Sequence, residues 1–475
     1  MQTVAIIDIG KSNVKLALVD LLRGEEIAVV TQPNTVRPGP PWPHFDTRAQ
    51  WAFLTDALRR MARDHRVDGI AVTTHGACAA VLAADGELVA PVLDYEHDGP
   101  DALRAEYEAI RPPFAETGSP ALSHGLNLGA QLHYMLRQDP ALADRIAHVV
   151  TWPQYWGFRL TGKLACDVCS LGAHTDLWNP RSGTWSALPA RLGLASRIAP
   201  ARRPDEVLGL LTPALQKDLG LAAVPVLVGI HDSNASLLPH LGQRSAPFSV
   251  VSTGTWVISM AIGGDPVTLD PARDTLINVS AFGQPVPSAR FMGGREHDQI
   301  RQGSADPGSD ADAAQVLARA VMLLPAVVSD CGPFQGRTHR WIGTAETDGQ
   351  RAVALGWYLA LVTAESLAVI GAQGPSLIEG PFSANPWFLQ MLASATGRPV
   401  IPSPGRTGTA VGAARLFQTA TPLPEADKTV ILPSDRLAGY ARDWRSRCAG
   451  EGRDQRSSAD GAWIMAGCLA PTARF

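Results

Sequence analysis

Residues 4–19 read V-A-I-I-D-I-G-K-S-N-V-K-L-A-L-V. The apolar residues 4–7 predict a short strand that leads into a polar stretch, and residues 14–19 predict a second strand. Gly10 and Asn13 lie between the two strands and favour a tight turn. We therefore expect a hairpin with Asp8 just before its turn.

Residues 248–261, F-S-V-V-S-T-G-T-W-V-I-S-M-A, repeat this arrangement in the second half of the chain. Two apolar strands again flank a glycine-containing turn, here Thr253-Gly254-Thr255. Two hairpins of the same design favour two similarly built halves. Because strand–turn–strand units are common in proteins, the repetition alone leaves coincidence open.

Strands and helices are predicted to alternate along the rest of the chain, which indicates an α/β fold. Asp46 or Thr47 is expected to cap a helix that runs to about His65. Residues 81–88 predict a hairpin with Asp85-Gly86 as its turn. The other predicted strands are residues 27–31, 69–74, 225–229, 376–378 and 399–401, and the other predicted helices lie near residues 128–137, 154–160, 385–396 and after residues 232 and 408.

The composition excludes several classes of protein. A chain of 475 residues is long enough for two or three domains. A hydrophobic share of 45% and a net charge of −4 predict a globular protein without a surface for nucleic acid or anionic membranes. The six scattered cysteines indicate no disulfide framework. Cys166 and Cys169 form a C-x-x-C pair, for which packing is preferred to a metal site because no further ligands lie nearby.

No segment predicts export or membrane insertion. The N-terminus lacks the basic region of a signal peptide. The most apolar long stretch, residues 352–372, contains Glu365 and has no basic flank, so it predicts a buried helix rather than a membrane anchor. We therefore expect a cytoplasmic protein.

Phosphoryl transfer needs backbone N–H donors around the phosphates, a carboxylate for a metal ion and a base near the acceptor hydroxyl. Asp8, beside Gly10 and Lys11, could hold Mg²⁺, although an aspartate that closes a β-turn is the simpler interpretation of this residue alone. Residues 252–255 could cradle a phosphate or form a plain hairpin turn. No Walker A sequence occurs where one would be needed.

Two further regions carry polar or small residues next to predicted helix starts. Asp232 follows a predicted strand and is a candidate general base, or else an ordinary helix-capping aspartate. His231 could hydrogen-bond a sugar hydroxyl or fill a polar pocket. Residues 380–384 precede a helix and could face a nucleotide. Gly408 and Gly412 allow close packing against a flat ring or against a neighbouring sheet.

The order of these motifs is more specific than any one of them. The chain contains, in this order, D-I-G-K-S-N-V-K, G-I-H-D-S-N-A, S-T-G-T-W, E-G-P-F-S-A-N-P-W-F-L-Q and T-G-T-A-V-G-A-A. This series resembles the FGGY carbohydrate kinase family over about residues 3–418. His231-Asp232 and Gly254-Thr255-Trp256 most resemble the branch of the rhamnulokinases and L-fuculokinases.

The resemblance implies an actin-like ATPase fold of two ribonuclease-H-like domains, with ATP and sugar meeting in the cleft between them. We expect an N-terminal domain over residues 1–240, with the sugar side, the first phosphate loop and the catalytic aspartate. A C-terminal domain over residues 241–447 would carry the second phosphate hairpin and the adenosine side, and residues 448–475 are expected to form a loosely ordered tail. The implied ligands are a small sugar, ATP and Mg²⁺. Neither nucleic acid nor a membrane is expected as a partner, and a homodimer is compatible with the sequence.

The family's site residues are carried over only where the motifs match. The resemblance makes Asp232 the catalytic base and Asp8 the residue near Mg²⁺. The implied ATP contacts are Gly10, Lys11, Ser12, Asn13, Lys15, Thr253, Gly254, Thr255, Gly380, Ser383, Asn385 and Gly408. The implied sugar contacts are His75, Gly76, Tyr95, Glu96, His97, His231, Ser233 and Asn278.

The predicted activity is transfer of the γ-phosphate of ATP to a terminal hydroxyl of a ketose. The expected acceptors are L-fuculose, L-rhamnulose or a pentulose such as xylulose or ribulose. Lys11 and Asn13 stand where many family members have Thr or Ser and Gly, and residues 95–98 match the family's aromatic–x–Asp pattern only in part. These departures leave the individual sugar open.

Three rival functions are less compatible with these motifs. An ATPase that uses water as acceptor would need no sugar site, and His75 and His231 argue against it. A sugar sensor without catalysis would be expected to lose Asp8 or Asp232, and both are present. A dinucleotide dehydrogenase is not favoured because no G-x-G-x-x-G follows the first predicted strand.

Overall fold

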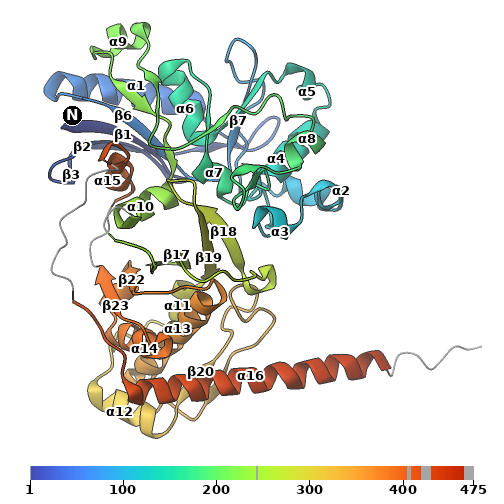
Figure 1. The fold of residues 1–475 in the computed structure, drawn as a ribbon, viewed down its shortest axis with the longest axis vertical. Coiled ribbons are helices and arrows are strands. Elements are labelled where there is room, and N and C mark those ends of the chain that lie inside the picture. The colour runs from blue at the N-terminus through green and yellow to red at the C-terminus, as the bar shows by residue number, and fades with distance from the viewer. Residues whose placement is uncertain (1, 242–243, 404–407, 419–428, 465–475) are drawn as a thin grey trace, which may run out of the picture. The chain divides into compact units, whose positions relative to one another are not determined.

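The computed structural model describes residues 2–241, 244–403, 408–418 and 429–464. The chain divides into two compact units, each of which contains separate stretches of the sequence. Unit 1 comprises Met1–Ser245, Leu276–Ser288 and Arg406–Ala426, and unit 2 comprises Ala246–Thr275, Ala289–Gly405 and Asp427–Phe475. The structure contains two large mixed β-sheets, and Figure 1 shows the elements by label and colour.

The sheet of unit 1 has the strand order β13-β14-β6-β1-β2-β3, and β15 also pairs with β6. The predicted first hairpin is the antiparallel pair β1–β2, and β6 lies parallel to β1 on its other side. The strands of this sheet are β1 (Thr3–Ile9), β2 (Asn13–Asp20), β3 (Glu25–Pro33), β6 (Ile70–Thr74), β13 (Val207–Leu210), β14 (Pro225–Leu227) and β15 (Ile230–His231).

Strand β1 buries alternate side chains on opposite faces of this sheet, as expected for a central strand covered by helices on both sides. On one face Ile7 packs in a cluster with Leu54 of α1, and on the other face Ile6 packs in a cluster with Ala410 of α15. Figure 1 shows α1 on one side of the sheet and α10 and α15 on the other. The longer helices of unit 1 are α1 (Thr47–Asp64), α2 (Arg104–Ile110), α4 (Leu128–Gln138), α6 (Trp152–Thr161), α9 (Pro213–Leu219), α10 (Asp232–Leu241) and α15 (Thr409–Ala414).

Short elements complete unit 1. The predicted cap of α1 is confirmed, because the side chain of Asp46 accepts a hydrogen bond from the backbone N–H of Ala49. The remaining elements are β4 (Val36–Arg37), β5 (His44–Phe45), β7 (Ala79–Leu82), η1 (Gly99–Leu103), α3 (Phe114–Thr117), α5 (Leu142–Arg145), β8 (His148–Thr151), β9 (Cys166–Asp167), α7 (Val168–Gly172), β10 (Trp178–Asn179), β11 (Thr184–Trp185), α8 (Leu188–Arg191), β12 (Ala201–Arg202) and η4 (Arg415–Gln418).

The predicted hairpin over residues 81–88 is confirmed, because Leu82 forms an antiparallel bridge with Leu88 and the N–H of Ala83 donates to the carbonyl of Glu87 over 2.8 Å. Its turn forms, since the N–H of Gly86 donates to the carbonyl of Ala83. Strand β7, however, pairs along its length with β8, with Val81 opposite Val149. Both valines are buried, and β8 is therefore a second partner of β7 that the local sequence did not predict.

The second sheet has the order β18-β19-β17-β16-β22-β23. It repeats the pattern of the first sheet: β16 and β17 form an antiparallel hairpin, and β22 lies parallel to β16 on its other side. The strands are β16 (Phe248–Thr253), β17 (Val257–Ile262), β18 (Thr275–Val279), β19 (Pro285–Phe291), β22 (Ser376–Glu379) and β23 (Val400–Ser403). Two units with the same strand–turn–strand core support the interpretation of a repeated architecture.

Helix α13 is the predicted buried apolar helix. It is long and apolar enough to cross a membrane, but 83% of its most apolar window is buried inside the structure, as in a core helix. Helix α16 runs beyond residue 447, into the segment predicted as a loosely ordered tail, and residues 465–475 lie outside the described part of the chain. The other elements of unit 2 are η2 (Pro271–Arg273), α11 (Gly293–Arg301), α12 (Asp310–Ala318), β20 (Met322–Leu324), β21 (Arg340–Ile342), α13 (Asp348–Val369), η3 (Pro381–Ala384), α14 (Pro386–Thr396) and α16 (Asp435–Ile464).

Candidate functional site

The carboxyl ends of three neighbouring parallel strands meet at one edge of the unit 1 sheet. Asp8 in β1 is in register with Thr73 of β6, and Thr73 is in register with Ile230 of β15. Adjacent strands lie ~4.8 Å apart, so the residues that follow them are close in space. His75 follows β6, and Asp232 follows β15 as the first residue of α10. The structure thus brings together three predicted site residues that are far apart in the sequence.

Asp232 is held by its immediate neighbours. The Nε2 atom of His231 lies 3.2 Å from its Oδ1 atom, and the backbone N–H of Ser233 donates to the same oxygen over 2.6 Å. His231 is buried and is oriented in turn by Asn234, whose Oδ1 lies 3.0 Å from the Nδ1 atom of the ring. The side chain of Asp232 is 32% exposed. The carboxylate therefore has a fixed orientation and remains accessible to a ligand.

Gly76 allows the close approach of His231 to the chain after β6. A Cβ atom at Gly76 would lie 2.7 Å from the Nε2 atom of His231, closer than real Cβ atoms come. This observation gives a physical reason for glycine at one of the predicted sugar-side positions.

His75 lies in an aromatic environment. Its ring centroid is 5.0 Å from that of Phe45 and 5.3 Å from that of Tyr95. Its Nδ1 atom lies 2.9 Å from the carbonyl oxygen of Gly76, and its Nε2 atom is buried without a hydrogen-bond partner among the described residues. Burial lowers the pKa of His75, so the ring is neutral at neutral pH. A neutral ring with an unpaired nitrogen is suited to a hydrogen bond with a sugar hydroxyl.

Asp8 is a partly buried carboxyl. Burial raises its pKa to about 6, and nearby Asp232 and Glu26 act in the same direction, against the effect of Lys15. The ammonium of Lys15 is itself bound to Glu26, with Nζ 2.6 Å from Oε1. Gly408, at the start of α15, adjoins this pair, since a Cβ atom there would lie 3.7 Å from Oε1 of Glu26. Asp8, Lys15 and Gly408 are therefore neighbours within unit 1.

The first turn is fixed by Asn34, the residue that directly follows β3. The N–H of Gly10 donates to the carbonyl of Asn13 over 2.9 Å. The side chain of Asn34 donates to the carbonyl of Gly10, and its backbone N–H donates to the carbonyl of Ser12, both over 2.8 Å. Ser12 and Asn13 themselves are exposed.

The side chain of Lys11 extends from this turn toward two carboxylates, and the sequence motifs did not predict these contacts. Its ammonium binds Asp94 and lies 3.1 Å from Oε2 of Glu96. It also lies over the ring of Tyr95, 4.8 Å from the centroid. Asp94 was not predicted as a site residue, although it directly precedes the predicted Tyr95 and Glu96, and its contact with Lys11 spans 83 positions of the sequence.

Two predicted sugar-side residues have other neighbours. The Nε2 atom of His97 lies 3.2 Å from the hydroxyl of Tyr134, and the two rings pack edge to face. The side chain of Asn278, in β18, donates to the hydroxyl of Ser288 over 3.0 Å. Neither contact joins these residues to His75 or Asp232, and their predicted role has no support from the observed contacts.

In unit 2, two predicted ATP-side motifs touch each other. The hydroxyl of Thr253 donates to the carbonyl of Glu379 and accepts a hydrogen bond from the N–H of Phe382 over 3.1 Å. Gly380 has a φ of 80°, and a Cβ atom there would overlap the carbonyl oxygen of Thr253. Glycine is therefore required where the loop after β22 crosses the end of β16.

The turn of the second hairpin is supported by α11. The N–H of Gly254 donates to the carbonyl of Trp256 over 3.0 Å, and the N–H of Gly294 donates to the carbonyl of Thr255 over 3.2 Å. A Cβ atom at Gly294 would overlap the carbonyl oxygen of Gly254. Gly294 was missed by the sequence motifs; its position in a Gly-Gly pair just before a helix was the available signal.

Two other predicted ATP contacts have evident structural roles. The hydroxyl of Ser383 donates to the carbonyl of Gly380 over 2.7 Å. Asn385 caps α14, because its side-chain oxygen accepts from the N–H of Phe388 over 3.2 Å. Both residues shape the loop before α14 in unit 2.

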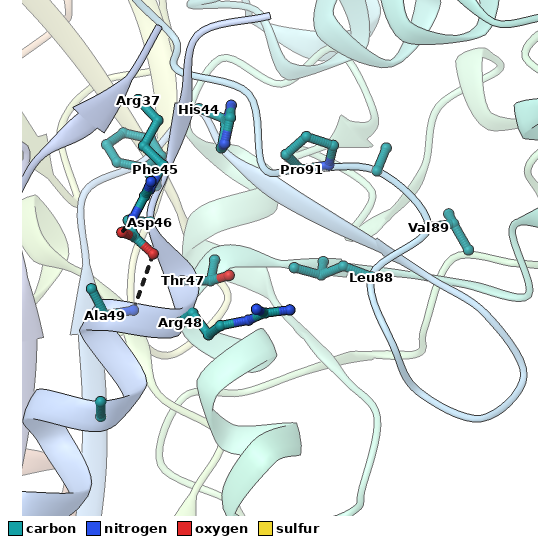
Figure 2. Close-up of a pocket in the computed structure, with 12 residues that line it drawn as sticks. Arg37, His44, Phe45, Asp46, Thr47, Arg48, Ala49, Leu88, Val89 and Pro91 are labelled. Atoms are coloured by element: carbon teal, nitrogen blue, oxygen red, sulfur yellow. Dashed lines mark hydrogen bonds and ion pairs between the residues drawn. The ribbon is translucent and has the colours of Figure 1, made fainter. Parts of the chain in front are cut away.

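A cavity of about 730 Å³ opens beside the N-terminus of α1 (Figure 2). Its lining residues are Arg37, His44, Phe45, Asp46, Thr47, Arg48, Ala49, Ala52, Leu88, Val89, Ala90 and Pro91. The cavity shares Phe45 with the surroundings of His75, but neither Asp8 nor Asp232 lines it. Figure 2 shows the carboxylate of Asp46 bound to the start of α1, so this group is engaged as a helix cap.

No group of three or more His, Cys, Asp or Glu residues that could hold a metal ion alone was found within the described residues. The C-x-x-C cysteines are both free and buried, which agrees with packing.

Comparison with known proteins finds a matching family model for each half of the chain. Residues 3–239 match the model of the N-terminal domain of the FGGY family of carbohydrate kinases, and residues 245–425 match that of the carbohydrate kinase FGGY C-terminal domain. A carbohydrate kinase from Novosphingobium aromaticivorans is 37% identical and has a TM-score of 0.88, covering 94% of this chain and 100% of that one.

Two further relatives are similar to this chain in sequence. Xylulose kinase from Escherichia coli (strain K12) is 27% identical over 90% of this chain and 92% of its own length. L-fuculokinase from Salmonella typhi is 26% identical over 55% of this chain and 57% of its own length. The predicted actin-like fold of two ribonuclease-H-like domains is confirmed by the solved relatives. With both domain models matched in order and the fold shared along the chain, the protein belongs to the FGGY family of carbohydrate kinases and is a sugar kinase.

Proposed function

We propose that this sugar kinase transfers the γ-phosphate of ATP to a terminal hydroxyl of a ketose, with Asp232 as the general base. The main support is the meeting of Asp8, His75 and Asp232 at the carboxyl ends of β1, β6 and β15. Phosphoryl transfer needs a carboxylate for a metal ion and a base near the acceptor hydroxyl, and the neutral ring of His75 could orient that acceptor.

In the proposed step, Asp232 accepts the proton of the sugar hydroxyl while that oxygen attacks the γ-phosphorus. A P–O bond to the sugar forms and the P–O bond to ADP breaks. His231 and the N–H of Ser233 hold Oδ1 of the base, which fixes the direction from which it receives the proton.

Asp8 is the proposed contact for Mg²⁺. Because burial raises its pKa to about 6, a nearby cation would favour the ionised form. Mg²⁺ in proteins commonly binds one or two carboxylates together with phosphate oxygens and water, so a lone carboxyl fits this ion better than it fits a metal held by protein alone. Bound there, Mg²⁺ would offset the negative charge of the phosphates.

The acceptor is proposed from the motifs and the relatives together. Two of the relatives named above are a xylulose kinase and an L-fuculokinase, and both names describe ketose kinases. L-Fuculose, L-rhamnulose and the pentuloses xylulose and ribulose are therefore the first compounds to test. We propose the cytoplasm as the site of action, where ATP and Mg²⁺ are supplied.

Exchange of Asp232 for asparagine tests the base. Asp232→Asn should lower kcat by ~10²–10⁴, because it removes general-base catalysis and keeps the shape of the side chain. ATP binding should change little. Asp56→Asn, in an exposed ion pair with Arg60 on α1, is the matched control and should keep full activity. If Asp232→Asn turned over within a factor of two of wild type, another residue would be the base.

A coupled assay of ADP release across sugars tests the acceptor. We expect at least one ketose to exceed glycerol and gluconate in kcat/KM by tenfold or more. A tenfold preference for glycerol or gluconate over every ketose would refute the proposed acceptor and leave the sugar kinase intact. Hydrolysis of ATP without stimulation by any sugar or polyol would favour an ATPase.

A further inference from the structure

Lys11 lies in the predicted phosphate loop, but its side chain contacts residues of another segment of the chain. Its ammonium binds Asp94 and Glu96, and its side chain is 22% exposed. The ammonium lies 4.8 Å from the ring centroid of Tyr95 and 5.3 Å from that of Phe45. The same two rings pack against His75. Lys11 therefore points into the surroundings of His75, in contrast to Lys15, which is bound to Glu26 beside Asp8.

The carboxylates that hold Lys11 are themselves oriented by the backbone. Asp94 is buried, its N–H donates to the carbonyl of Pro43 over 2.9 Å, and its Oδ1 accepts from the N–H of Glu96 over 3.2 Å. Glu96 is 63% exposed, so it forms the accessible part of the group. One cation between two carboxylates leaves an excess of negative charge.

We propose that Lys11 is a specificity-determining residue of the sugar side, which together with Asp94 and Glu96 selects a neutral polyhydroxylated acceptor and rejects sugar acids. This inference rests on the proposed function. The ammonium and the carboxylates present donors and acceptors to sugar hydroxyls beside His75. Because Asp232 adds a further carboxylate nearby, a sugar that carries its own carboxylate meets net repulsion.

The alternative is that Lys11 binds a phosphate of ATP. It would then have to leave two carboxylates, one of them buried, and those groups would lose their only described cationic neighbour within 4 Å. Loss of a buried ion pair is unfavourable, so the observed geometry favours the sugar side.

The test compares Lys11→Met with wild type by direct binding and by steady-state kinetics. Binding of xylulose, ribulose and L-fuculose is measured by calorimetry without nucleotide, and KM for ATP is measured at a saturating concentration of the sugar. Removal of charge-assisted hydrogen bonds should raise the sugar Kd ~10–100-fold and change KM for ATP less than ~3-fold. Arg59→Met, which breaks the exposed pair with Asp218, is the matched control and should change neither value.

Glu96→Gln is the second variant and guards against poor folding of Lys11→Met. This variant should raise kcat/KM for gluconate, relative to kcat/KM for the ketose, at least ~5-fold, because it removes an accessible negative charge. If Lys11→Met raised KM for ATP and left the sugar Kd unchanged, or if Glu96→Gln left the ratio unchanged, the inference would be overturned while the proposed function stood. If wild type bound none of the sugars, both would fail.

Discussion

Replacement of Asp8 by asparagine is expected to make the ligand-free protein more stable at neutral pH. Burial raises the pKa of Asp8 from 3.8 to about 6, so the native state opposes ionisation of this carboxyl. Asparagine has nearly the same shape and carries no charge. The variant should therefore gain stability while it loses the proposed contact for Mg²⁺.

The size of the gain follows from the pKa. A pKa of about 6 instead of 3.8 means that the native state disfavours the ionised form of Asp8 by ~3 kcal/mol relative to the unfolded chain. Because the pKa is raised, the native state holds the proton more tightly than the unfolded chain, and stability falls as pH rises from ~4 to ~6. The loss of stability caused by ionisation of Asp8 reaches its full size above pH ~7 and is roughly half of that size at pH 5. Since Asp8 is only partly buried, we expect ~1–3 kcal/mol at pH 8, or a rise of ~3–8 °C in Tm.

Thermal unfolding in EDTA at pH 5 and pH 8 measures this effect. Asp8→Asn should exceed wild type in Tm by more at pH 8 than at pH 5, and its activity with Mg²⁺ and ATP should be strongly reduced. Asp56→Asn again provides the control, because its carboxylate is exposed. Equal Tm values at pH 8, or a gain that does not depend on pH, would refute the reasoning.

Three further variants test positions described above. Gly76→Ala should raise KM for the sugar ~10-fold or more, because the added methyl meets the ring of His231; unchanged sugar kinetics would show that the ring can move aside. Gly380→Ala should weaken ATP use and lower Tm, because the Cβ overlaps the carbonyl of Thr253 at a φ of 80°, and a variant with wild-type Tm would contradict this. Trp444→Ala should destabilise unit 2 by ~3–5 kcal/mol in denaturant titration, since the ring is 1% exposed; a loss below ~1 kcal/mol would be inconsistent with its burial.

The parts of the fold that depend on local pattern could be predicted from the sequence. The hairpin around Gly10, the second hairpin around Gly254 and the Asp46 cap all arise from residues within a few positions of one another. Local turn chemistry and alternation of apolar residues are sufficient for such elements. The local hairpin after β7 was also predicted, but the pairing of β7 with β8 was not, because β8 is distant in sequence and nothing near residue 81 specifies it.

The site could be predicted as a set of residues but not as a geometry. The motifs identified Asp8, His75 and Asp232, yet their meeting depends on the parallel pairing of β1, β6 and β15. The resemblance to the family placed Lys11 among the ATP contacts. Its partner Asp94 lies on another segment, and only the folded chain shows that the two charges meet.

The last helix to join unit 1 affects how the protein folds during synthesis. Ile6 in β1 is covered by α15, whose Ala410 and Ala413 are fully buried in the same cluster. At ~5–20 residues per second, a ribosome needs ~10–30 s to travel from α10 to α15. During that interval α10 can cover part of this face of the first sheet, but the part that packs against α15 stays uncovered and is an expected binding surface for chaperones. A fragment that stopped near residue 240 would lack α15 permanently and keep that part of the face exposed, so we expect it to aggregate.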